Sequence, residues 1–235
     1  MGFWQVTMKR STQLSKSYVI IGAFLTVYGV VLSNLMTIIP SVIPSDVTPV
    51  PIDLANSFPL LSIALLSMAS VLFALPVIML FVYDKNNGVL EYLLSTGLDQ
   101  LDIFKGYVKA SLVLATYLLV FAVILNTVVG VLLGTSLTLL ASIGILTFAI
   151  GISEVFLVSV CMVAFSSLQR TPMGANQPLG VIIGVVPMFP ALILPLAFPA
   201  YALVVDLSIA AVTLLASLAL LLSTGRLIRR EKLLP

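Results

Sequence analysis

Long runs of apolar residues constrain this chain more than any other feature. A helix crossing about 30 Å of hydrocarbon needs about 20 predominantly apolar residues. Because backbone polar groups in lipid must be paired within the segment, and the ten-residue alternation of a barrel is absent, such runs predict helices. The sequence therefore predicts an all-α integral membrane protein with six transmembrane helices. The predicted spans are Tyr18–Ile39, Phe58–Tyr83, Ala110–Leu133, Leu137–Leu168, Leu179–Phe198 and Leu207–Ser223.

The composition excludes several classes of function. Of the 235 residues, 60% are hydrophobic and 9% are charged, too few charges to coat a soluble domain. The net charge of +2 offers no field for a nucleic-acid partner. The absence of histidine and the single cysteine, Cys161, exclude histidine-based catalysis, a zinc site and an internal disulfide. We therefore expect no catalytic centre, no metal site and no cofactor bound by this chain.

The distribution of basic residues predicts the orientation. Every Lys and Arg falls before the first span, after the last span, or in alternate loops. The only charged residues in the intervening loops are Asp46, Asp53 and Asp206. By the positive-inside rule, both termini are cytoplasmic in a multi-pass protein of the cell membrane. The basic residues are Lys9, Arg10, Lys16, Lys85, Lys105, Lys109, Arg170, Arg226, Arg229, Arg230 and Lys232.

We expect residues 1–235 to form a single transmembrane domain without an internal repeat. Residues 1–17 mix apolar and basic side chains and predict a short amphipathic helix in the headgroup region, with Trp4 as anchor. The proline-rich outer loop 40–57 is either a passive connector or a lid. Prolines also interrupt the segment 179–206, so the fifth span is either kinked or re-entrant in its outer half. The fourth span is long enough either to project into the cytoplasm or to be broken near Gly144 or Gly151.

The cytoplasmic segment 84–109 carries the most information. Asn87-Gly88 predicts a turn out of the membrane, and Gly97 interrupts the pattern that follows. Thr96 and Asp99 predict the start of a second short helix, running toward Lys109. The sequence thus predicts a helical hairpin just inside the membrane. Its leucines at helical spacing are Leu90, Leu93, Leu94, Leu98 and Leu101.

The charges of this hairpin favour a protein partner. Helices that rest on headgroups usually carry Lys or Arg on their polar face. Residues 86–104 contain neither, and carry Glu91, Asp99 and Asp102 instead. We therefore favour docking into a groove of another protein over the alternative of a helix lying on lipid.

The same residues resemble a known family. The pattern Gly88-x-Leu90-Glu91-x-Leu93-Leu94-Ser95, then Leu98, Asp102-Ile103 and Gly106, is similar to the first cytoplasmic loop of type-2 ATP-binding cassette (ABC-2) permease subunits. That loop commonly reads as an acidic residue, Gly-Thr-Leu-Glu, a leucine pair, Ser, a proline-containing turn, Glu-Ile and Gly-Lys. The likeness covers the segment 84–109 directly, and the six-span plan extends it loosely over the chain. The departures are Val89 for Thr, Gly97 for Pro and Tyr107 for Lys.

The resemblance implies a coupling helix that sits in a cleft of an ABC ATPase subunit. Glu91 would contact that subunit, Leu90, Leu93 and Leu94 would be the packing face, and Gly88 the turn. Ser95, Asp102 and Gly106 complete the matching motif. This chain lacks a G-x-x-x-x-G-K-[ST] phosphate loop, so ATP and Mg would bind a separate partner ATPase.

The resemblance further implies a second permease subunit, identical or related. The two subunits would form an exporter, and membrane lipids would surround it. A pathway lined by apolar and hydroxyl side chains favours a hydrophobic, amphipathic or peptide cargo.

Glu154 is the only charged residue clearly inside a predicted span. Glu154 is either a pathway or gating residue or a helix-packing hydrogen-bond partner. Two Gly-x-x-x-Gly pairs favour close helix packing within the subunit over a dimer seam. An intramembrane enzyme needs several polar groups at one depth, which the sequence lacks. An ion-coupled carrier or channel working without an ATPase is the main alternative. The glycine pairs are Gly130 with Gly134 and Gly180 with Gly184.

Overall fold

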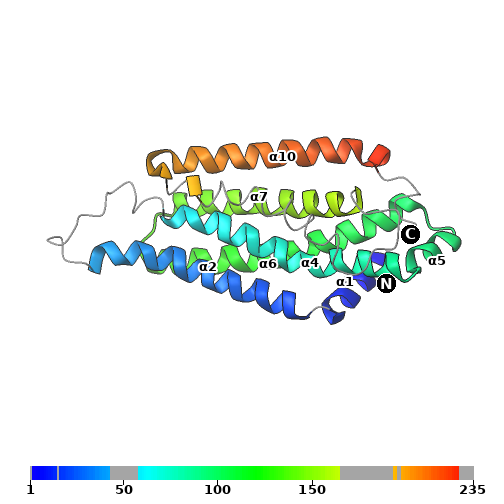
Figure 1. Ribbon diagram of the computed structural model, residues 1–235. Helices are drawn as coiled ribbons and strands as arrows, with labels where there is room; N and C mark the ends of the chain where they lie inside the picture. Colours follow the sequence, from blue (N-terminus) through cyan, green and yellow to red (C-terminus); the bar gives the residue numbers. More distant parts are fainter. Residues whose placement is uncertain (1, 15, 43–57, 165–192, 195–196, 228–235) are drawn as a thin grey trace.

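The regular elements of the described chain are all helices (Figure 1). The computed structural model describes residues 2–14, 16–42, 58–164, 193–194 and 197–227. Within them, the predicted all-α fold is confirmed. The main elements are α1 (Phe3–Leu14), α2 (Lys16–Val42), η1 (Phe58–Leu60), α4 (Leu61–Asn86), α5 (Val89–Ser95), α6 (Gln100–Leu132), α7 (Leu137–Ala164), η2 (Pro199–Tyr201) and α10 (Ala202–Leu227).

Five helices, α2, α4, α6, α7 and α10, are long and apolar enough to cross a membrane. They correspond to five of the six predicted runs, as expected of a multi-pass membrane protein. Helix α7 continues through Gly144 and Gly151, so of the two alternatives for the fourth span the break at these glycines is wrong. A Cβ atom on Gly151 would lie 3.0 Å from Ser70 Oγ, so this glycine allows α4 to approach α7.

The predicted fifth span falls almost wholly outside the described residues. Helix α7 ends at the end of the bundle where α1 lies, and α10 begins at the opposite end (Figure 1). Gly180, Gly184 and the loop 43–57 also lie outside the described residues. The six-span plan and the geometry of the fifth span therefore stay predictions.

Helix α4 occupies the middle of the bundle, where it contacts α1, α2, α6 and α7. Helix α10 packs against α7 along one face, which carries Ala202, Asp206, Ala210 and Thr213. The leucines on its other faces are exposed, as suits a helix that borders lipid. The apolar core is thus built mainly by α4, α6 and α7, and α4 is buried over most of its length.

Two boundaries at the α1 end of the bundle bear on the candidate site. Helix α1 forms within the predicted amphipathic segment 1–17. Helix α6 begins at Gln100, not at the predicted Ala110, and runs without a break. The prediction of a separate second short helix in the hairpin is therefore wrong, because its residues form the first turns of α6.

Candidate coupling site at the α4–α6 connection

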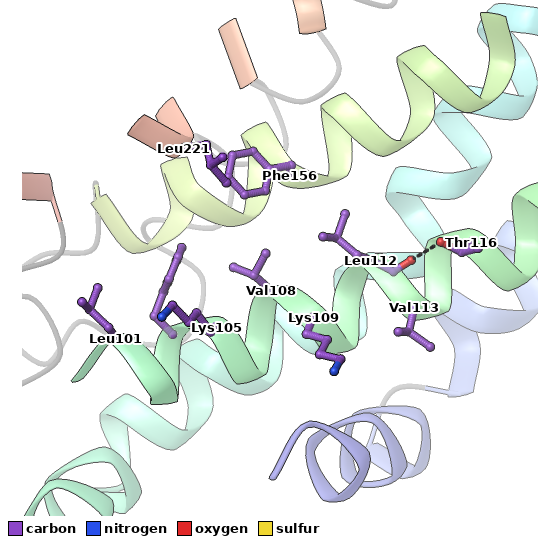
Figure 2. A pocket seen from close by; sticks show the side chains of 10 residues that line it. Leu101, Lys105, Val108, Lys109, Leu112, Val113, Thr116, Phe156 and Leu221 are labelled. Atoms are coloured by element: carbon purple, nitrogen blue, oxygen red, sulfur yellow. Dashed lines mark hydrogen bonds between the residues drawn. The ribbon is translucent and has the colours of Figure 1, made fainter. Parts of the chain in front are cut away.

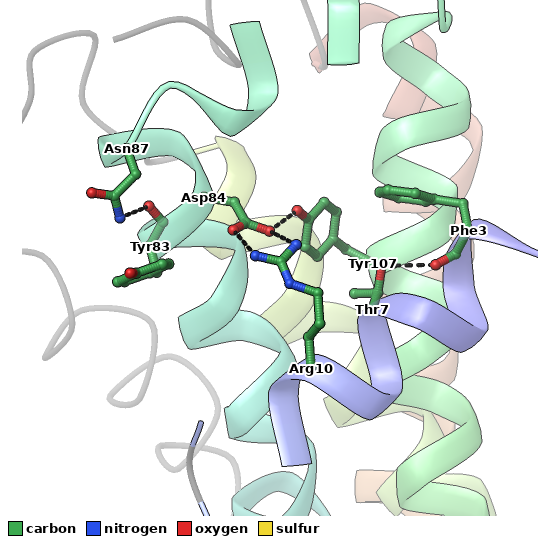
Figure 3. A network of polar contacts seen from close by, with 7 residues as sticks. All are labelled: Phe3, Thr7, Arg10, Tyr83, Asp84, Asn87 and Tyr107. Carbon is green, nitrogen blue, oxygen red and sulfur yellow. Dashed lines mark hydrogen bonds and ion pairs between the residues drawn. The ribbon is translucent and has the colours of Figure 1, made fainter. Parts of the chain in front are cut away.

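Two glycines in left-handed conformation bound the short helix α5. Gly88 has φ 73° and directly precedes α5, which confirms the predicted turn at Asn87-Gly88. Gly97 has φ 88° in the turn that leads to α6. Side chains with a Cβ atom rarely adopt these values, so the glycines set where α5 begins and ends. The Asn87 side-chain amide donates a hydrogen bond to the carbonyl oxygen of Tyr83, at 2.9 Å (Figure 3).

The apolar side of α5 packs against the chain's own core. Leu90 and Leu94 are buried in a cluster with Phe81, Ile103 and Phe104, which come from α4 and α6. Leu93 is half-buried against the same cluster. The resemblance assigned these leucines to a packing face toward an ATPase. In this structure they serve intramolecular packing, because α5 folds back onto the helices that it connects.

The outward side of the connection presents a different set of residues. We define the α5 outer surface as the exposed residues Glu91, Tyr92 and Ser95 of α5 together with Leu98, which follows the helix. The exposed fractions of Tyr92 and Leu98 are 67% and 40%, which is high for large apolar side chains. The Ser95 hydroxyl is bonded to the carbonyl oxygen of Tyr92, at 2.7 Å. Asp99 and the predicted site residue Asp102 are exposed beside this surface, so it combines apolar area with negative charge.

A buried carboxylate joins three helices just before this connection. Asp84, at the end of α4, is fully buried. It accepts two hydrogen bonds from the Arg10 guanidinium of α1, at 2.8 and 3.1 Å, and one from the Tyr107 hydroxyl of α6, at 2.6 Å (Figure 3). A charge withdrawn from water needs such partners, and a bidentate guanidinium is among the strongest. We call Arg10, Asp84 and Tyr107 the α1 anchor.

Sequence reasoning missed the α1 anchor. Arg10 and Asp84 are 74 residues apart, and no spacing rule connects them. Tyr107, noted only as a departure from the family pattern, is the residue that donates to Asp84. The available signal was an acidic residue at the end of a predicted span together with a basic amphipathic segment.

Aromatic contacts complete the docking of α1. The Phe3 ring meets the Tyr107 ring edge-on, with centroids 5.6 Å apart. Gly106 lies directly beneath Phe3, so closely that a Cβ atom there would overlap the ring. The ammonium group of Lys109 lies 5.0 Å from the centroid of the Trp4 ring. Gly106 was predicted to lie at the ATPase interface, but it is buried beneath α1. A larger residue there would overlap the Phe3 ring in its present position.

Two carboxylates are buried inside spans. Glu154 of α7 is fully buried, and neither of its oxygens has a hydrogen-bond partner within the described ranges. Asp206 was predicted for an outer loop, and this is wrong: it lies in α10, fully buried, with neither oxygen partnered by any residue that the structure describes. Burying a carboxylate in a span is costly, so such residues are functional candidates.

The two glycines at the end of α6 have different surroundings among the described residues. Gly130 faces Leu140 of α7, and a Cβ atom there would lie 2.5 Å from Leu140 Cδ2. Gly134 lies beyond the end of α6 with φ 78°, and a Cβ atom there would meet no described atom within 4 Å. This glycine lies in the turn toward α7, and its predicted packing role stays a prediction.

Both α5 and α1 are attached to the same two helices. The leucines of α5 pack against α4 and α6, and the α1 anchor joins α1 to α4 and α6. Comparison of the chain with known protein families, with curated proteins and with solved structures finds no match in any of the three.

Proposed function

We propose that this chain is the permease subunit of an ATP-driven transporter of the ABC-2 type, located in the cell membrane and driven by a separate ATPase subunit. The observation that carries the proposal is how the residues of the α4–α6 connection are arranged. Leu90 and Leu94 pack α5 against α4 and α6, two helices that could cross a membrane, whereas Tyr92 and Leu98 are exposed. Exposed apolar side chains on a fixed helix are typical of a protein-binding surface.

The chemistry of the α5 outer surface defines the partner cleft. Tyr92 is a rigid amphipathic anchor of the kind that dominates binding energy when it enters a pocket. Glu91 and the neighbouring aspartates call for Lys or Arg on the rim of that pocket. The partner is therefore an ATPase whose surface carries an apolar pocket with basic residues around it.

The mechanism follows from how α5 is held. ATP and Mg bind the partner, and ATP binding draws two ATPase subunits together. Each ATPase pushes on an α5 outer surface, and the tight packing of α5 passes the motion into α4 and α6. The span bundles of this chain and of a second permease subunit, identical or related, then rock between inward-open and outward-open states. The cargo is a hydrophobic, amphipathic or peptide substrate, and the direction of transport is export.

Two matched tyrosine variants test the proposal. Tyr92 and Tyr201 have exposed fractions of 67% and 65%. Tyr92 lies in α5 and Tyr201 lies in η2, directly before α10, and α5 and the start of α10 are at opposite ends of the bundle (Figure 1). We expect an ATPase with a phosphate-loop motif to co-purify from native membranes with the parent chain and with Tyr201→Arg. The Tyr92→Arg variant should lose it, because the new charge enters the pocket. An ATPase retained by Tyr92→Arg, or absent from the parent preparation, contradicts the proposal.

One observation favours an ion-coupled carrier or channel as a second candidate. The sequence suggested a single charge inside the spans, but Glu154 and Asp206 are both buried there, and neither has a hydrogen-bond partner among the described residues. Intramembrane carboxylates of this kind mark ion and proton pathways. This candidate predicts flux into liposomes that contain the chain alone, without nucleotide, and loss of that flux in Glu154→Gln. The absence of nucleotide-independent flux contradicts it.

A further inference from the structure

An apolar groove runs along the α6 surface where α6 faces α7 and α10. Its volume is about 600 Å³, within the range of about 300–1,000 Å³ typical of ligand sites. Val108 and Leu112 of α6 form one wall, and Phe156 of α7 and Leu221 of α10 lie across from them (Figure 2). Leu221 is largely exposed, so the groove opens at the side of the bundle, where lipid borders a membrane protein.

Two lysines lie on the α6 side of the groove, between apolar lining residues (Figure 2). Lys105 and Lys109 line it together with the apolar residues, and they lie one helical turn apart on α6. Both are exposed, and among the described residues that line the groove none is acidic. Lys109 also lies over the Trp4 ring, so this side of the groove borders α1. The groove therefore joins a hydrocarbon-like surface to a pair of positive charges.

We propose that this groove binds one anionic phospholipid, with an acyl chain along Val108 and Leu112 and the phosphate at Lys105 and Lys109. The lateral opening suits a ligand that is already in the bilayer. The apolar walls suit an acyl chain, whose burial is favourable in proportion to its apolar area. Basic side chains beside a membrane helix attract anionic headgroups, and basic pockets between helices bind them. A zwitterionic lipid offers the same chains but no net charge for the lysines.

The chain carries its own reporter for this site. Trp4 is the only tryptophan of the chain, and its ring contacts Lys109. A brominated acyl chain held in the groove lies close to this ring and quenches its fluorescence. The measurement uses the full-length protein in phosphatidylcholine nanodiscs, with brominated phosphatidylglycerol added in increasing proportion. Brominated phosphatidylcholine at the same proportions measures quenching by bulk lipid.

The site predicts a saturable quenching component for the anionic lipid alone. Lys105→Gln should raise the proportion of lipid at half-saturation about fivefold, as expected for one basic residue near an anionic headgroup. Lys9→Gln removes the same charge from an exposed position on α1 outside the groove, and it should leave the titration unchanged. Lys109 is left intact because its loss would alter Trp4 directly.

A second variant tests the acyl-chain part of the site. Val113→Phe adds bulk at a lining, half-buried position while both lysines stay in place, so it should abolish the saturable component. An unchanged Trp4 emission maximum without brominated lipid shows that this variant is folded. Equal quenching by the two brominated lipids, equal effects of Lys105→Gln and Lys9→Gln, or unaltered saturable quenching in folded Val113→Phe would each overturn the proposal. None of these measurements involves an ATPase, so they are independent of the proposed function.

Discussion

Removing the Arg10 charge should release α1 from the bundle. In the α1 anchor, the guanidinium donates two hydrogen bonds to a carboxylate that is fully buried. Arg10→Gln keeps much of the side-chain length but removes the charge and the two-pronged geometry. The expected result is a more frequent detachment of residues Phe3–Leu14 from α4 and α6, while the rest of the bundle stays folded.

The structure sets the size of this effect. Removing one partner of a buried ion pair costs about 3–5 kcal/mol. The Arg10 side chain is 41% exposed, and the Tyr107 hydroxyl still donates to Asp84, so we expect a lower value of about 2 kcal/mol. At about 1.4 kcal/mol per tenfold change, this raises the detached population about 30-fold.

Hydrogen exchange of the α1 amides measures this population directly. Amides of α1 that exchange through detachment should speed up about 30-fold in Arg10→Gln. Lys9→Gln, which removes a neighbouring exposed charge, should leave them unchanged. Combining Arg10→Gln with Asp84→Asn completes a double-mutant cycle, in which the two effects should be clearly non-additive. Additive effects, or an Arg10→Gln exchange rate equal to that of Lys9→Gln, would refute the reasoning.

Three further substitutions have expected outcomes. Gly106→Ala should displace α1 and shift the Trp4 emission maximum, because the new Cβ atom overlaps the Phe3 ring. Adding Phe3→Ala should reverse the shift, and an unshifted emission maximum in Gly106→Ala would contradict the contact. Leu94→Asp should destabilise the chain itself by several kcal/mol, because the new carboxylate enters an apolar cluster. The expected sign is loss of the monodisperse peak in size-exclusion chromatography, and a stable variant would show that α5 does not pack against this cluster. Glu154→Gln should keep the free energy of unfolding within about 1 kcal/mol of the parent value, because no described hydrogen bond is lost. A large drop in melting temperature would show that Glu154 has a hydrogen-bond partner.

Local patterns predicted the elements that depend only on local sequence. The apolar runs predicted five of the long helices, since their length and composition determine helix formation in lipid. Asn87-Gly88 predicted the turn before α5 because glycine readily adopts the conformation found there. Helix α6 was predicted to begin too late, because Lys105 and Lys109 were taken to mark a loop. A helix can continue past the hydrocarbon boundary with charged side chains on its surface.

Contacts between distant parts of the chain were beyond local patterns. Helical spacing showed that α5 has an apolar side, but not whether that side meets a partner or the chain's own core. Leu90 is buried by Phe81 and Ile103, whose proximity follows only from the packing of α4 beside α6. The position of Asp206 was misjudged for a similar reason. A charge near the end of an apolar run suggested a loop, whereas α7 covers that face of α10.

The most direct test of the central claim places a photo-crosslinking benzoylphenylalanine at position 92. Replacement of Tyr92 puts the probe on the α5 outer surface, and replacement of Tyr201 puts an equally exposed probe at the opposite end of the bundle. After irradiation in native membranes, we predict that position 92 forms a covalent adduct with a polypeptide carrying the ABC phosphate-loop motif, and that position 201 does not. An adduct of position 92 with lipid alone or with a protein lacking that motif, or the same ATPase adduct from both positions, would contradict the account.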